Sequence, residues 1–244
     1  MVSLPASQDA GCSPAAQDYL RALYALTDGG SFHAVRATTS DIARRLAVQP
    51  ASVTAMLQKL AAAEPSLVDY HKNNGARLTP AGERAALAVV RCHRLLELFL
   101  HEKLGYGWDE VHDEADRLEH VISAAMVERL AAALGQPTHD PHGHAIPDAN
   151  LALPDPAAVA LGTLRVGQAA VVRYVADDDP AVLRELDGAG LRPGAALRLE
   201  AITADGAHCV RLAGWEGNTT IGAAAAAGVF VSADATSTIN SGRA

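Results

Sequence analysis

The sequence predicts a mainly α-helical chain with small β elements: an N-terminal winged helix-turn-helix, a helical middle domain and a small C-terminal β-barrel. Three observations predict this class. Two short helical patterns around a tight break precede a strand–turn–strand pattern, long helical patterns fill the middle, and short apolar runs then alternate with Gly and Asp turns. The 244 residues are enough for two to three small domains.

The first third of the chain carries the pattern of a winged helix. Apolar residues recur with helical spacing over 16–27, Thr39 and Ser40 start a second helix, and Pro50 suits the first turn of a third. Two short helices joined by a tight turn form a helix-turn-helix. Strand residues then flank an Asn-Gly turn within 67–79, which predicts the β-hairpin of a wing.

The rest of the chain changes pattern twice. A long helix is expected over 80–104, and two shorter helices are expected between Trp108 and Leu134. Beyond a Pro-rich linker the apolar runs are short, and a helix at about 180–189 interrupts them, which predicts a small barrel. The expected domains are 1–79 (winged helix-turn-helix), 80–150 (helical domain), 151–158 (linker), 159–233 (barrel) and 234–244 (flexible tail).

Charge and histidine are distributed unevenly along the chain, whose net charge is −8. Residues 1–79 carry seven Lys and Arg against six Asp and Glu, a net of +1. Residues 80–150 carry six against twelve, a net of −6, and hold seven of the ten histidines. Residues 151–244 carry seven against ten, a net of −3. Phosphate binding depends on local basic surface, so the total charge does not exclude a DNA-binding domain at the N-terminus.

Three further features narrow the class of protein. No run approaches 18 consecutive apolar residues, which argues against a membrane span. The N-terminus lacks the basic and apolar regions of a secretory signal. The three cysteines are far apart and form no CxxC motif, which predicts neither a disulfide framework nor a thiolate zinc site. We therefore expect a cytoplasmic protein with no membrane contact.

Six metal-ligand side chains lie on two predicted helices of the middle domain. Two are spaced i,i+4 on the long helix, and four share one face of the next helix. A first-row divalent cation needs several imidazole and carboxylate donors at one point, and two facing helices commonly supply them. A charged helix face is often only solvated, but six such donors interleaved with apolar residues favour a metal site. The expected ligands are His93, Glu97, His112, Asp116, Glu119 and His120.

A separate histidine-rich stretch follows these helices. His139, His142 and His144 could form a metal-binding tract, but their Pro- and Gly-containing segment is interpreted as a solvated loop.

Several segments between residues 18 and 147 carry a resemblance to a known family. They are DYLRALYAL at 18–26, SDIARRLAVQPASVTAMLQKL at 40–60, LTPAG at 78–82, HRLLE at 93–97, VHDEADRLEHVIS at 111–123 and DPHGHAIP at 140–147. In this order they resemble the metal-dependent repressors typified by the diphtheria toxin repressor and the manganese transport regulator. The VHDEADRLEH block is highly specific, whereas the helix-turn-helix is shared by many regulators. The C-terminal part looks like the SH3-like (iron-transport-A-like) domain that some members carry.

The resemblance implies two metal sites and a regulatory function. The function is metal-dependent repression of transcription in metal homeostasis, by a homodimer that binds double-stranded operator DNA. The implied regulatory site comprises Asp18, Asp116, Glu119 and His120. The implied ancillary site comprises His93, Glu97 and His112 with a ligand from the barrel, for which Asp177 is the candidate.

The residues at two of these positions bear on the choice of metal. Iron-responsive members typically have a sulfur ligand where this chain has Asp116, and a methionine where it has Asp18. Harder oxygen donors favour Mn²⁺ relative to a site containing sulfur. We expect Mn²⁺ as the effector ahead of Fe²⁺, with other divalent first-row metals binding in vitro.

The winged helix also offers candidate DNA contacts. Gln49 is expected to read a base edge, and the hydroxyl groups of this region are expected to meet phosphate. The wing supplies two cations for backbone phosphate. The expected contacts are Thr39, Ser40, Gln49, Ser52, Thr54, Gln58, Lys72 and Arg77.

Two other functions remain open at the level of sequence. One is a winged-helix regulator that responds to a small organic ligand, with solvated acidic helices. The other is a metal-dependent enzyme, which we do not expect, because the chain has no nucleophile motif and no phosphate-binding loop. DNA binding measured with Mn²⁺ and with a chelator would separate the three.

Overall fold

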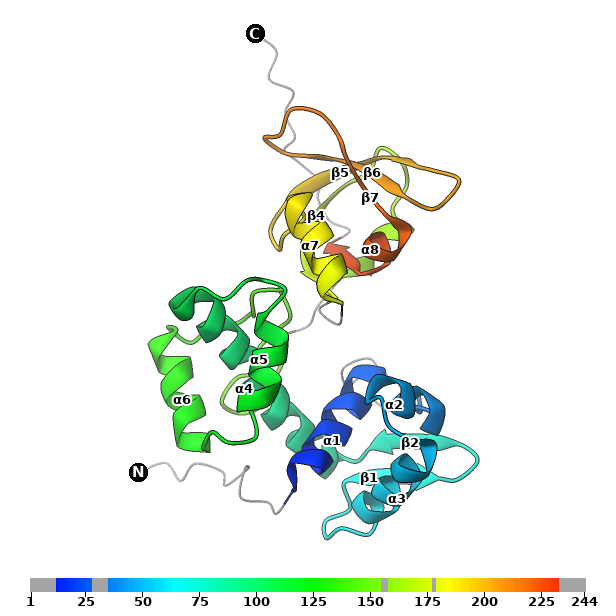
Figure 1. Ribbon diagram of the computed structural model, residues 1–244, viewed down its shortest axis with the longest axis vertical. Helices are drawn as coiled ribbons and strands as arrows, with labels where there is room; N and C mark the ends of the chain where they lie inside the picture. The colour runs from blue at the N-terminus through cyan, green and yellow to red at the C-terminus, as the bar shows by residue number, and fades with distance from the viewer. Residues whose placement is uncertain (1–11, 28–34, 155–157, 177–178, 233–244) are drawn as a thin grey trace. The chain divides into compact units, whose positions relative to one another are not determined.

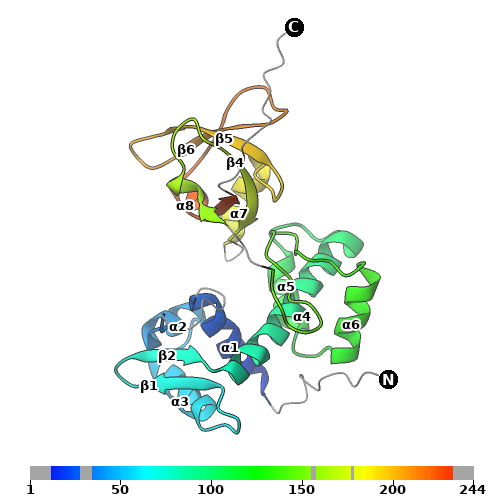
Figure 2. The same cartoon turned by 180° about the vertical axis from the view of Figure 1, so that it is seen from behind.

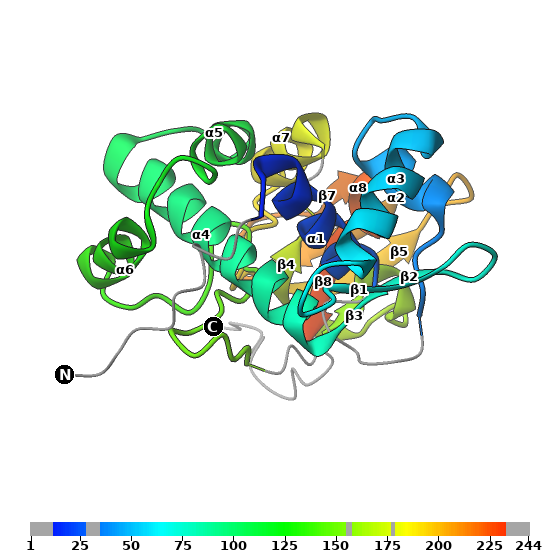
Figure 3. The same ribbon diagram turned by 90° about the horizontal axis from the view of Figure 1, so that it is seen from below.

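The computed structural model describes residues 12–27, 35–154, 158–176 and 179–232 (Figure 1). The chain divides into two compact units. The first unit comprises 1–93, 118–136 and 147–152, and the second comprises 94–117, 137–146 and 153–244. The long helix α4 (Pro80–Leu104) contributes to both, and Figure 3 shows it as one continuous helix. The expected tail, 234–244, lies outside the described residues.

The first unit contains the winged helix-turn-helix that the sequence predicts. Its elements are α1 (Pro14–Leu26), α2 (Thr39–Arg45), α3 (Pro50–Ala61), β1 (Val68–His71) and β2 (Gly75–Leu78). Figure 2 shows the hairpin of β1 and β2 extending beside α2 and α3. Gly75, at the hairpin turn, has a φ of 76°, and a Cβ there would lie 2.4 Å from the carbonyl oxygen of Ala37. The turn therefore requires glycine.

Local capping explains where the first helices begin. Thr38 caps α2 by accepting the backbone N–H of Asp41 at 3.1 Å, so the cap lies one residue before Thr39. Pro50 occupies the first turn of α3, as expected. The apolar side chains on the inner faces of α1, α2 and α3 are fully buried. Burial of each such side chain contributes about 1.5–3 kcal/mol to the stability of the fold. The most buried are Leu20, Leu23, Ile42, Val53 and Leu57.

The middle helices differ from the prediction in one respect that affects the metal site. Helix α4 matches the expected range, but the next helix, α5, covers only Val111–Leu118. Ser123 then caps α6 (Ala124–Ala133) by accepting the N–H of Met126 at 3.2 Å. Helix α5 therefore ends before the expected Ser123, and Glu119 and His120 lie in the turn that follows it. Asp116 and Glu119 nevertheless offer ligand atoms within 4.8 Å of each other.

The second unit contains an antiparallel sheet with two short helices. Its strand order is β3-β8-β4-β5-β6-β7, and bulges interrupt the β4–β8 and β5–β6 pairings. Among the described residues no pairing joins the edge strands β3 and β7, so a closed barrel is not confirmed. The elements are β3 (Val159–Ala160), the 3-10 turn η2 (Leu161–Thr163), β4 (Ala169–Val175), α7 (Pro180–Gly188), β5 (Ala196–Ile202), β6 (His208–Leu212), β7 (Thr219–Ile221), α8 (Ala223–Ala227) and β8 (Val229–Ser232).

The core of the second unit includes a residue from outside the sheet. Trp108, between α4 and α5, packs in the same buried cluster as Leu161, Leu183 and Leu197. Its indole N–H donates to the carbonyl oxygen of Pro141 at 2.9 Å. The C-terminal core therefore extends into the segment that the sequence assigns to the helical domain. No helix in the described part of the chain is long and apolar enough to cross a membrane.

Candidate metal centre

Helix α4 holds the first two candidate ligands in a buried position. His93 and Glu97 lie one turn apart and are 4% and 0% exposed. The helix is rich in Ala and Leu and is buried on most of its surface through this stretch. A buried carboxylate or imidazole requires a polar or charged partner, because losing water disfavours its charged form. The positions of these two residues therefore indicate a polar centre inside a largely apolar setting.

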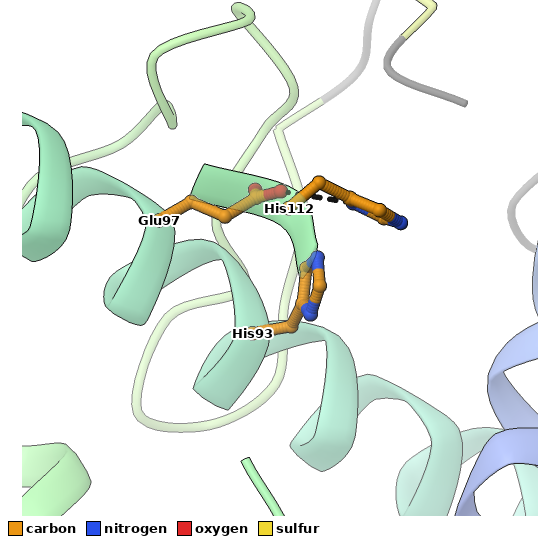
Figure 4. Close-up of side chains that lie close together, drawn as sticks. All are labelled: His93, Glu97 and His112. Atoms are coloured by element: carbon orange, nitrogen blue, oxygen red, sulfur yellow. Dashed lines mark hydrogen bonds and ion pairs between the residues drawn. The ribbon is translucent and has the colours of Figure 1, made fainter. Parts of the chain in front are cut away.

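Glu97 meets His112, which projects from the start of α5. His112 Nδ1 lies 3.1 Å from Glu97 Oε1, and His112 Nε2 lies 3.9 Å from a carboxylate oxygen of Asp116. Figure 4 shows His112 turned toward Glu97, with His93 one turn earlier on α4. His93, Glu97 and His112 form one of the groups able to hold a cation. The ancillary ligands predicted from these helices are thus brought together.

A second group surrounds Glu119, whose side chain is 1% exposed. Its Oε2 lies 2.7 Å from His93 Nδ1, and its Oε1 lies 3.7 Å from Arg21 Nε. Arg21 also places Nη1 3.0 Å from His93 Nδ1. The guanidinium group of α1 therefore supplies positive charge beside a buried carboxylate. The sequence pattern did not identify Arg21, although it lies one turn after Asp18.

His120 connects the turn after α5 to α1. Its Nε2 lies 2.9 Å from Asp18 Oδ1, and its Nδ1 lies 2.7 Å from Gln17 Oε1. Asp18, Glu119 and His120 each offer one ligand atom, and these atoms lie within 4.8 Å of one another. Gln17 was not predicted, because an amide carries no spacing signal that distinguishes it from a solvated side chain.

The donor set of this second group fits a divalent cation. Glu119 Oε1 is buried and has no hydrogen-bond partner among the described residues, with only the longer ion pairs to Arg21 and His120 nearby. Burial raises the pKa of Asp18 above 3.8, although the positive charges of His120 and Arg21 act in the opposite direction. Burial thus disfavours the ionised form of Asp18, and Glu119 Oε1 lacks a close partner in the described part of the chain. A cation held by these two carboxylates and the imidazole of His120 would stabilise the ionised carboxylates and bind Oε1.

Asp116 and Asp177 are the remaining predicted ligands. Asp116 belongs to α5, is 39% exposed at its side chain and contacts His112, and it offers a ligand atom within 4.8 Å of those of His93 and Glu119. Asp177 lies outside the described residues, so its assignment rests on the sequence.

Most of the expected DNA contacts are accessible on the winged helix. Thr39 and Ser40 begin α2, and Lys72 lies in the turn of the wing. On α3, Thr54 is half-buried and donates its hydroxyl to the carbonyl oxygen of Pro50 at 3.2 Å. The exposed candidates are Ser40, Gln49, Ser52, Gln58 and Lys72.

Arg77 is engaged within the wing itself. It faces Asp69 across the hairpin and donates Nε to Asp69 Oδ2 at 2.9 Å. Arg36 forms an ion pair with the same carboxylate oxygen, and Asp69 Oδ1 lies 3.0 Å from His71 Nε2. Arg77 therefore holds the two strands together, a role that the sequence pattern did not predict.

The histidine-rich loop is the other place where the interpretation of the sequence was wrong. His139 is exposed, but His142 is fully buried and His144 is half-buried. The loop folds against the C-terminal sheet, where the backbone N–H of Val175 donates to the carbonyl oxygen of His142 at 3.0 Å. A solvated loop would have neither feature.

Three family matches together cover most of the chain. Residues 12–76 match the iron dependent repressor N-terminal DNA binding domain. Residues 79–148 match the iron dependent repressor metal binding and dimerisation domain. Residues 159–233 match the FeoA domain.

Transcriptional regulators are similar in sequence to this chain over most of their own length. The chain is 33% identical to the iron-dependent repressor IdeR of Mycobacterium leprae (strain TN) over 195 residues, 75% of this chain and 82% of that protein. It is 36% identical to the regulator MntR of Bacillus pumilus (strain SAFR-032) over 118 residues, 48% of this chain and 77% of that protein. These relatives are transcriptional regulators rather than enzymes, and none supports a response to an organic ligand.

Solved structures agree in fold. A manganese-dependent transcriptional repressor in complex with manganese has a TM-score of 0.81 and 38% identity, covering 89% of this chain and 99% of that one. ScaR with bound Zn²⁺ has a TM-score of 0.73 and 29% identity, covering 88% and 98%.

Proposed function

This chain belongs to the iron-dependent repressor family of metal-dependent, DNA-binding transcriptional repressors, and we propose that Mn²⁺ at a regulatory site activates it to bind operator DNA. The ligands of the proposed site are Asp18, Asp116, Glu119 and His120. One observation carries the proposal. Asp18 of α1 and the pair Glu119–His120, a hundred residues later in the chain, offer ligand atoms within 4.8 Å of one another.

The choice of Mn²⁺ ahead of Fe²⁺ rests on the donor atoms. Positions 18 and 116 carry carboxylates where iron-responsive members typically have sulfur-containing side chains. Oxygen donors favour Mn²⁺ relative to sulfur donors, although the intrinsic affinity order of first-row metals still favours later ions such as Fe²⁺ and Co²⁺. The manganese-bound structure similar to this chain supports the same choice.

The position of Asp18 suggests how metal controls DNA binding. Asp18 lies on α1, the first helix of the DNA-binding domain, whereas Glu119 and His120 follow α5. A cation held by all three restricts the motion of α1 relative to that turn. In a homodimer, this restriction fixes the separation of two recognition helices, which must match half-sites about one helical turn (about 34–36 Å) apart. Metal and DNA then increase each other's affinity by the same factor.

The second group of ligands is proposed as an ancillary site. His93, Glu97 and His112 would hold a second cation, and Asp177 remains the candidate ligand from the C-terminal domain. His93 also contacts Glu119 at 2.7 Å. Occupation of the ancillary site therefore influences the hydrogen bonding of a regulatory ligand.

The proposed partners are operator DNA and a second copy of the chain. The match to a dimerisation domain over 79–148 supports the homodimer, and Val121 and Met126 are apolar side chains exposed at 76% and 44% in that region. The base-reading residue is Gln49, with Thr39, Ser40, Ser52, Thr54, Gln58 and Lys72 at the backbone. Arg77 contributes by holding the wing in shape. As a repressor of metal homeostasis, the protein would act on DNA in the cytoplasm.

Fluorescence anisotropy with a labelled operator duplex tests the proposal. We expect binding in Mn²⁺, weaker activation by Fe²⁺ under anaerobic conditions, and loss of binding in a chelator. His120→Ala should abolish the Mn²⁺ response, and the exposed His139→Ala is the matched control. A normal Mn²⁺ response in His120→Ala would remove the regulatory site assignment.

A further inference from the structure

The loop between α6 and the C-terminal sheet is folded around a buried carboxylate. Asp140 is 5% exposed, and its Oδ1 accepts the backbone N–H groups of His142 and His144, both at 2.9 Å. These two hydrogen bonds explain why the loop turns at this position. They use one carboxylate oxygen only, and they place two imidazole rings on the same turn as the carboxylate.

His142 has a ring nitrogen available for a ligand. Its Nε2 lies 2.8 Å from the carbonyl oxygen of Trp108, and because a carbonyl oxygen only accepts, Nε2 carries the proton. In the neutral ring, Nδ1 then has an unprotonated lone pair. Nδ1 is buried in a fully buried side chain and has no hydrogen-bond partner among the described residues. Leaving such an acceptor unsatisfied is unfavourable, so the nitrogen indicates a missing partner.

The second carboxylate oxygen of Asp140 is also buried and also lacks a hydrogen-bond partner among the described residues. The side chain is 0% exposed, and Oδ2 accepts no hydrogen bond from the described residues. It lies 3.4 Å from His144 Nδ1 and 3.6 Å from Arg94 Nε. Asp140, His142 and His144 each offer one ligand atom, and these atoms lie within 4.8 Å of one another.

We propose that Asp140, His142 and His144 form a third cation site that binds a divalent first-row metal ion. Two imidazoles and one carboxylate are a donor set that suits Fe²⁺, Co²⁺ and Zn²⁺, with solvent completing the coordination. His142 has the arrangement common in metal-binding histidines, in which the nitrogen that does not bind metal donates its hydrogen to a carbonyl oxygen. The site shares no ligand with the regulatory or ancillary groups.

One nearby charge opposes cation binding. Arg94, on α4, forms the long ion pair with Asp140 and also donates to the carbonyl oxygen of Ala145. Its guanidinium group competes with a metal for Asp140 and repels it. The third site therefore binds a cation more weakly than a site with the same ligands and no arginine nearby.

The surroundings of the loop give the site a structural consequence. The ring of His144 lies 5.2 Å from that of Tyr174 on β4, between centroids. A Cβ on Gly143 would lie 2.1 Å from the carbonyl oxygen of Arg173, so the loop backbone rests directly on β4. A metal ion that ties His142 and His144 to Asp140 stabilises the surface that contacts this strand.

Equilibrium dialysis of the full chain against Co²⁺ tests the proposal. Asp140→Asn keeps an oxygen for the two backbone N–H groups but removes the charge, and His144→Gln alters a half-buried ligand. We expect each variant to bind one equivalent of Co²⁺ fewer than wild type, whereas the exposed His139→Gln binds the same number. Activation of DNA binding by Mn²⁺ should persist in all three. Unchanged stoichiometry in Asp140→Asn and His144→Gln overturns the site, and His144→Gln alone decides if Asp140→Asn fails to fold.

Tryptophan fluorescence locates the additional ion. The chain has two tryptophans, and in a Trp215→Phe background Trp108 remains, with its ring centroid 5.2 Å from that of His142. Paramagnetic Co²⁺ should quench it in a step that His144→Gln abolishes and His112→Ala retains. If His112→Ala abolishes every quenching step and His144→Gln none, the ion lies at the ancillary group and the proposal is wrong.

Discussion

Replacing Asp18 with asparagine separates metal affinity from the stability of the fold. The side chain is 38% exposed, and asparagine has nearly the same shape. Burial raises the pKa of Asp18 above 3.8, so ionising this carboxylate costs more free energy in the metal-free folded state than in the unfolded chain. The neutral amide removes that cost and also loses the ion pair with His120. We therefore expect the free energy of unfolding without metal to change by no more than about 0.5 kcal/mol.

The metal-dependent part of the stability should fall sharply in the same variant. Disturbing a group that only orients a metal ligand weakens metal affinity by about 10–100-fold, so losing the charged ligand itself should cost at least about 100-fold. At free Mn²⁺ of about 100 times the wild-type Kd, binding stabilises the wild type by about 2.7 kcal/mol. A variant with a Kd raised about 100-fold gains only about 0.4 kcal/mol at that concentration. The expected difference is about 2.3 kcal/mol.

Urea denaturation followed by circular dichroism, with Mn²⁺ and with a chelator, measures both quantities. Asp113→Asn is the matched control, because Asp113 is exposed on α5 and its substitution makes the same change of charge. If Asp18→Asn retains the full stabilisation by Mn²⁺, Asp18 is not a ligand, and the proposed link between α1 and the turn after α5 fails.

Three further predictions concern the wing, the choice of metal and the dimer. Partial burial raises the pKa of Asp69, but the hydrogen bond from Arg77 and the charge of Arg36 outweigh it and hold the pKa below 3.8. A depressed pKa stabilises the folded state above pH 3.8, and this contribution is lost as the pH falls through the lower folded value. The wild type should therefore lose up to about 1 kcal/mol more than Asp69→Asn on acidification, measured by urea denaturation at several pH values. Asp116→Cys should raise activation by Co²⁺ and Fe²⁺ relative to Mn²⁺ in anaerobic anisotropy titrations, because sulfur favours softer metals. Val121→Asp should weaken the homodimer about tenfold or more in analytical ultracentrifugation, because it places a charge on an exposed apolar side chain of the dimerisation domain.

Each of these has an outcome that would contradict it. Equal acid sensitivity in wild type and Asp69→Asn would mean that the wing network contributes no pH-dependent stability. The same ranking of metals in wild type and Asp116→Cys would remove the main support for manganese. A dimer of unchanged affinity in Val121→Asp would place the interface elsewhere on the domain.

The sequence by itself determined the order of the winged helix, the long helix and the C-terminal sheet, and it indicated most of the candidate metal ligands. Helical periodicity, Pro50 and the Asn-Gly turn are local signals, because capping, backbone restriction and turn geometry act over a few residues. For the same reason, the i,i+4 spacing of His93 and Glu97 indicated two candidate ligands from one helix. The family resemblance added Asp18, whose partner lies about a hundred residues away and cannot be inferred from spacing.

The tertiary structure alone decided how these residues meet. Glu119 and His120 lie in the turn after α5, and only the tertiary structure brings them to Arg21 and Asp18 of α1. The burial of His142 depends on the sheet against which its loop packs. In both cases the deciding contacts join residues far apart in the chain, and no pattern within a short window contains them.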